Sequence, residues 1–134
     1  MTLQQRLAVV LNEILPVQEE DDGAVTVHHD DTFASLRMVT IAEGLDMVSL
    51  TQILAWDLLL DSKLRAKVAK HANDTLLGTV SLVEKGAARR DSKKTADVML
   101  RYNFPAGGLS DDALRTLILM VLATGADVRR ALVG

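Results

Sequence analysis

The sequence predicts an α+β domain in which an antiparallel sheet of about five strands packs against three helices in two layers. Segments with helical spacing of apolar residues occur at both ends and in the middle of the chain, and β-branched segments separated by short turns lie between them. Strands joined by short turns pair antiparallel, and the helices bury their apolar stripes on the sheet. With 134 residues, the chain is expected to form a single domain over residues 1–134.

The N-terminal part is expected to form one helix and three strands. Thr2 and Gln5 have the spacing of a capping box, and apolar residues recur at helical intervals until Pro16 ends the pattern. An acidic turn over residues 19–23 follows. The strands are predicted over residues 24–28, 33–42 and 45 to about 60.

The third of these strands is ambiguous. Ser49 and Gln52 could open a helix as a capping box, but apolar residues that alternate along one face favour a strand. These alternating residues are Val48, Leu50, Leu54 and Trp56.

The C-terminal part is expected to add a helix, two strands and a final helix. Asp61 or Ser62 can cap the middle helix of the chain, which continues to about Thr75. The strands are predicted over residues 79–83 and 97–104, with a basic loop between them, and Ser110 caps the last helix. The predicted order is therefore helix, three strands, helix, two strands, helix.

Composition excludes several classes of function. The chain has no cysteine, which excludes a disulfide framework, cysteine-ligated zinc and a thiol nucleophile, and is compatible with the cytoplasm, where we expect the protein. A net charge of −3 and only four aromatic residues make nucleic acid an unfavoured partner. The uncharged apolar stretch at residues 116–126 is shorter than the ~20 residues of a membrane span.

The second and third predicted strands are apolar on both faces. An antiparallel sheet with one solvated face alternates apolar with polar residues, so the second face here needs its own covering. The middle helix, another subunit or a different protein could supply it. The sequence therefore predicts a partner or dimer surface formed by Val48, Leu50, Leu54 and Trp56. Trp56 is equally compatible with a place in the core.

Metal-ligating residue types cluster at one turn, which contains His28, His29, Asp30 and Asp31. Neighbouring side chains of an extended segment point to opposite faces, so the two histidines are poorly placed to chelate one ion. We favour a solvated turn and expect no metal or cofactor. The alternative is a small metal-dependent hydrolase that uses His28, Asp30, Asp31 and His71.

Two groups of basic residues could contact an anion. One is the middle helix, with Lys63, Lys67 and Lys70, and the other is the loop, with Lys85, Arg89, Arg90, Lys93 and Lys94. A run of charges is usually a solvated surface, which is the interpretation we favour. The alternative is a binder of an anionic ligand through the loop.

The chain resembles the YbjN-like family in this order of helices and strands and in two segments. They are Leu-Leu-Gly-Thr-Val-Ser-Leu at 76–82 and Val-Met-Leu-Arg-Tyr-Asn-Phe-Pro-Ala-Gly-Gly-Leu at 98–109. Members of that family share the fold of class I type III secretion chaperones. The resemblance implies a two-layer α+β fold, a homodimer and a role in binding polypeptide or in regulation, and it brings no catalytic motif. We therefore expect a non-catalytic, homodimeric protein-binding module, chaperone-like or regulatory.

Overall fold

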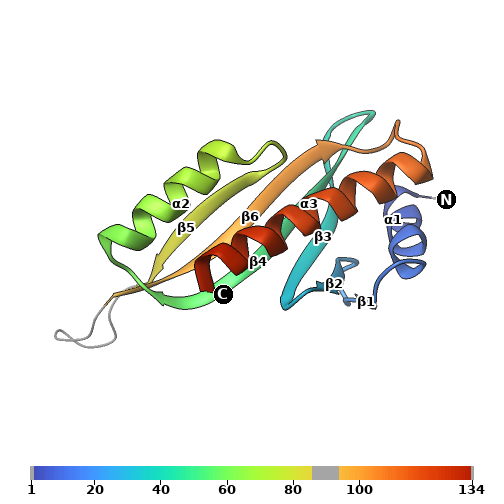
Figure 1. Cartoon of the computed structure of the whole chain (residues 1–134). Coiled ribbons are helices and arrows are strands. Elements are labelled where there is room, and N and C mark those ends of the chain that lie inside the picture. Colours follow the sequence, from blue (N-terminus) through green and yellow to red (C-terminus); the bar gives the residue numbers. More distant parts are fainter. Residues whose placement is uncertain (1, 86–93, 134) are drawn as a thin grey trace.

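Six antiparallel strands form one sheet, and three helices lie against one of its faces (Figure 1). The computed structural model describes residues 2–85 and 94–133. The strand order across the sheet is β1-β2-β3-β4-β6-β5. The elements are α1 (Leu3–Asn12), β1 (Val17–Glu19), β2 (Val25–His29), β3 (Thr32–Ala42), β4 (Leu45–Leu59), α2 (Ser62–Asp74), β5 (Thr79–Lys85), β6 (Thr95–Pro105) and α3 (Asp111–Val133).

The predicted fold class and order of elements are confirmed, with one strand added. The addition is β1, a three-residue edge strand that pairs with β2 from Val17↔Val27 to Glu19↔Val25. The sequence predicted only a turn there, because three residues are too few to show alternation. The ambiguous third segment is the strand β4, as favoured, and the helix alternative is wrong.

One face of the sheet forms the core. Alternate side chains of the long strands point toward the helices, and Leu36, Leu50 and Leu100 are fully buried there. The middle helix α2 joins this core through Leu64 and Val68. It therefore covers the same face as α1 and α3, and cannot supply the second covering that the sequence analysis considered.

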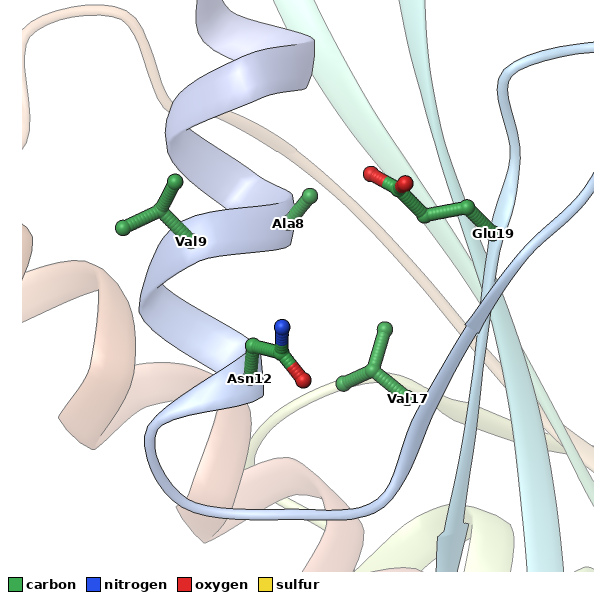
Figure 2. Close-up of a pocket in the computed structure, with 5 residues that line it drawn as sticks. All are labelled: Ala8, Val9, Asn12, Val17 and Glu19. Carbon is green, nitrogen blue, oxygen red and sulfur yellow. The ribbon is translucent and has the colours of Figure 1, made fainter.

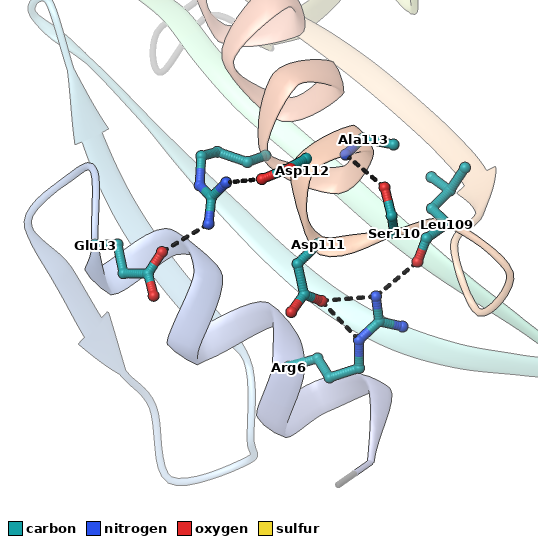
Figure 3. Close-up of polar contacts among 8 residues, drawn as sticks. Arg6, Glu13, Leu109, Ser110, Asp111, Asp112 and Ala113 are labelled. Atoms are coloured by element: carbon teal, nitrogen blue, oxygen red, sulfur yellow. Dashed lines mark hydrogen bonds and ion pairs between the residues drawn. The ribbon is translucent and has the colours of Figure 1, made fainter.

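Polar contacts fasten α1 to the start of α3 (Figure 3). Arg6 donates to Asp111 Oδ1 and to the carbonyl oxygen of Leu109, at 2.9 and 2.7 Å. Arg115 pairs with Glu13 at 2.7 Å. Ser110 Oγ accepts from the backbone N–H of Ala113 and caps α3, as the sequence predicted.

One polar side chain, Gln52 of β4, is fully buried within the core. Its Nε2 donates to Thr32 Oγ1 at 2.9 Å and to the carbonyl oxygen of Leu122 on α3 at 3.0 Å. Its Oε1 has no hydrogen-bond partner among the described residues. The amide lies where a Cβ at Gly125 would be, with Nε2 2.7 Å from that position. Gly125 therefore allows α3 to approach β4 closely.

Candidate functional site

The outer face of the sheet, opposite the core, is the candidate site, and none of the helices that the structure describes lies on it. Strand register arranges its side chains in rows across the sheet. Two polar rows cross the middle of the face, and we call them the polar belt. Their members are Ser35, Thr51, Arg101 and Thr79 in one row, and Arg37, Ser49 and Asn103 in the next. Apolar side chains flank this belt on both sides.

An aromatic patch lies on one side of the polar belt. It comprises Phe33, Ile53, Trp56, Val83 and Met99. Trp56 is 52% exposed, which is unusual for so large an apolar side chain at the centre of a sheet. Rings continue across neighbouring strands: His28 lies 6.0 Å from Phe33, and Phe33 lies 5.9 Å from Trp56, measured between centroids.

A bulge in β4 turns Trp56 onto this face. The register of β4 against β6 shifts twice between Ile53 and Leu58, and Asp57 has a positive φ of 52°, a strained conformation for a residue other than glycine. Asp97 holds the bulge, because its Oδ1 accepts from the N–H of Asp57 at 3.0 Å.

Lys85 completes this support from β5. Its Nζ lies 2.8 Å from Asp57 Oδ1 and 3.0 Å from Asp97 Oδ1, and it stands 5.6 Å from the centroid of the Trp56 ring. Hydrogen bonds to Asp57 and then Asp97 raise the pKa of Lys85 above its ordinary value. The cation is thus favoured beside the ring, in cation–π geometry. Its contribution to stability is present below the ordinary pKa and is lost as the pH rises through the higher pKa of the folded state.

Substitution of Asp97 by alanine is expected to lower the free energy of unfolding by about 1–3 kcal/mol, because the N–H of Asp57 loses the buried Asp97 carboxylate as its acceptor in a part-buried hydrogen bond. The bulge should loosen as well, so the fluorescence anisotropy of Trp56 should fall. Urea unfolding and anisotropy measure the two effects, with Asp46→Ala on the β3–β4 hairpin as control. An unchanged anisotropy would show that Asp97 does not position Trp56.

An aliphatic patch lies on the other side of the polar belt, formed by Val39, Ile41 and Met47. Together with Ser49 and Asn103 of the belt, these residues line an apolar hollow of about 260 Å³. Ile41 is 61% exposed. The outer face therefore presents an exposed indole ring at one end and a hollow at the other.

Most of the surface expected from the sequence lies elsewhere. Val48, Leu50 and Leu54 are 0–1% exposed and point into the core, so their assignment to a partner surface is wrong. The physical reason is register, because helices cover the even-numbered face of β4 up to the bulge. Trp56 lies beyond the bulge, on the outer face. Its role in an interface stays a prediction.

Among the outer-face residues that the sequence did not predict, Phe33 had a partial signal in the Asp30-Asp31 turn that precedes its strand. The strands β2 and β3 are joined by a two-residue turn in which Asp30 and Asp31 both have positive φ, of 43° and 62°. Such a turn fixes the pairing of His28 with Phe33. With Leu36 assigned to the core, Phe33 must then point outward.

The turn beside Phe33 does not assemble a metal site. His28 lies on the outer face, whereas His29 pairs with Thr32 on the core side and has its Nε2 3.7 Å from Asp30 Oδ2. His71 belongs to α2, which packs on β5, four strand spacings or about 19 Å across the sheet from β2. Within residues 2–85 and 94–133, no group of three or more histidine or acidic side chains could hold an ion. The constellation considered for a hydrolase is not brought together.

The basic loop falls largely outside the described residues, which include neither Arg89, Arg90 nor Lys93. Lys94 is described and exposed, and its carbonyl oxygen accepts from the N–H of Leu60 at 3.1 Å. In the described part of the chain, no helix has the length and apolar character needed to cross a membrane.

A second hollow, of about 200 Å³, lies between α1 and β1 (Figure 2). Ala8, Val9 and Asn12 line it from α1, and Val17 and Glu19 from β1. It combines one carboxylate and one amide with apolar side chains. This set contains neither a nucleophile with a base nor a pair of acids, so it offers no recognisable catalytic arrangement.

Neither the models of known protein families nor the curated proteins contain a match to this chain.

Proposed function

We propose that this protein is a non-catalytic, homodimeric module that binds protein, with a chaperone-like or regulatory role. One observation carries the proposal: the outer face of the sheet exposes Trp56, Phe33 and Val83 together, although helices bury the opposite face. Large exposed apolar side chains gathered on one face of a sheet mark an interaction surface. Tryptophan is also the residue type most enriched among the side chains that dominate interface energy.

Two further features support the proposal. The resemblance to the YbjN-like family, which we propose as kinship on the segments at 76–82 and 98–109, implies a homodimer that binds polypeptide. We place the protein in the cytoplasm, because a chain without cysteine has no disulfide that needs an oxidising compartment. The proposed role requires no metal or cofactor.

The proposal predicts that Trp56→Ala weakens self-association about thirtyfold or more, the effect of losing an interface residue worth 2 kcal/mol. Met120→Ala is the matched control. Met120 is 51% exposed, almost the same as Trp56, but it belongs to α3 on the helix side of the molecule. Sedimentation equilibrium of the wild type and both variants gives the dissociation constants. A wild type that stays monomeric, or equal weakening by both substitutions, would contradict the proposal.

A further inference from the structure

We infer that two copies of the chain pack outer face to outer face with their strands antiparallel, so that Trp56 of each copy occupies the hollow formed by Val39, Ile41 and Met47 of the other. This inference rests on the proposed self-association and adds to it the partner, the contact and the symmetry. It follows from the arrangement of the rows on the outer face, from the different shapes of the two apolar patches and from the area of the face.

The rows on the outer face are self-complementary. Along the three central strands β3, β4 and β6 they read apolar, polar, polar, apolar, with the two polar rows at the middle. Consider a two-fold axis that lies in the plane between the two copies, runs perpendicular to the strands and passes between the two polar rows. Rotation about this axis places each row of one copy over a different row of the other copy. The row of Ile53 then lies over the row of Met47, and the row of Thr51 over the row of Ser49. Apolar side chains meet apolar ones, and polar side chains meet polar ones.

Shape selects this antiparallel arrangement over the parallel one. The aromatic patch presents the large exposed ring of Trp56, whereas the aliphatic patch contains the hollow of about 260 Å³. Apolar cavities of ~150 Å³ accept benzene, so this hollow has room for an indole ring. A parallel arrangement would place Trp56 against Trp56 and leave the two hollows facing each other.

The area is adequate for a stable pair. At ~4.8 Å between strands and ~3.4 Å per residue, the face spans five strands from Thr51 to Trp56 but only β3, β4 and β6 from Met47 to Thr51, which gives roughly 450–600 Å² in projection. Side-chain relief adds to this value. Standard interfaces bury about 800 Å² per partner, so a second copy of the same face is an occupant of the right size.

A mixing experiment distinguishes the arrangements. In an antiparallel pair, Trp56→Ala removes both anchors and Ile41→Asp places a charge in both hollows, so each variant alone should associate about thirtyfold more weakly than the wild type, or weaker still. A mixed pair keeps one intact contact, formed by Trp56 of the Ile41→Asp chain and the unaltered hollow of the Trp56→Ala chain. The mixture should therefore dimerise at a concentration at which each variant alone is monomeric, as sedimentation velocity with one labelled chain can show.

Trp56 and Ile41 are both exposed, so the two variants should fold, and circular dichroism checks this. Ser49→Glu is a second variant that places a charge in the hollow. A mixture that stays monomeric while the wild type dimerises would overturn the antiparallel arrangement and leave the proposed self-association standing. A wild type that is itself monomeric would overturn both. Recovery in the mixture supports both.

Discussion

Leu54→Ala is expected to lower the free energy of unfolding by about 3–5 kcal/mol, whereas Trp56→Ala, two residues along the same strand, should change that of the monomer by less than about 1 kcal/mol. Leu54 is 1% exposed and lies in the core between β4 and the helices, so its removal leaves a cavity. Trp56 is 52% exposed on the outer face, where solvent or a partner can fill the space.

Urea unfolding followed by circular dichroism, at concentrations below the dimer dissociation constant, measures the two effects without the contribution of association. The comparison is informative because Trp56→Ala removes a larger side chain than Leu54→Ala does. If Trp56 belonged to the core, its substitution would cost as much as that of Leu54 or more. That result would remove Trp56 from the candidate site.

Gly125→Ala is expected to destabilise the protein by about 2–4 kcal/mol, although alanine favours a helix over glycine by about 1 kcal/mol. The new Cβ would overlap the side-chain amide of Gln52. Gln52 is fully buried and held by Thr32 and Leu122, so it cannot move without breaking hydrogen bonds inside the core.

Two variants test this explanation. Thr124→Ala changes the neighbouring, half-buried residue of α3 and should leave stability within about 0.5 kcal/mol of the wild type. Gln52→Ala removes the amide that the new Cβ meets, so Gly125→Ala should cost much less in that background than in the wild type. The double-mutant cycle consists of the wild type, Gly125→Ala, Gln52→Ala and the variant with both substitutions. Thermal and urea unfolding measures the stability of all four proteins. Additive effects would show that Gln52 is not the obstacle.

Periodicity predicted the fold because it depends on local spacing. Helical stripes, the Thr2 capping box and the long strand from Leu45 all occur where the pattern indicated. The strand β1 was missed because a three-residue edge strand has no period and is defined by its pairing with β2. The bulge at Asp57 also depends on a partner, Asp97, which lies 40 residues away in the sequence.

The candidate site was only partly predictable for a related reason. Alternation showed that β4 has two apolar faces, but the choice of which face the helices cover is made by tertiary packing. Spacing alone therefore assigns Leu50 to a surface, although this residue lies in the core. It also predicts Trp56 on the same face as Leu50, because a bulge that reverses the alternation cannot be read from spacing. Phe33, Met99 and Lys85 join Trp56 only through strand register.

The measurement that tests the central claim most directly is quenching of Trp56 fluorescence by acrylamide as a function of protein concentration. The chain contains one tryptophan, so the signal comes from the outer face alone. If this face binds a second copy, quenching should be strong in dilute protein and should weaken several-fold as dimers form, with the emission shifting to shorter wavelength. Strong quenching that does not change between about 1 and 100 μM, with a constant mass of 14.6 kDa, would contradict the account.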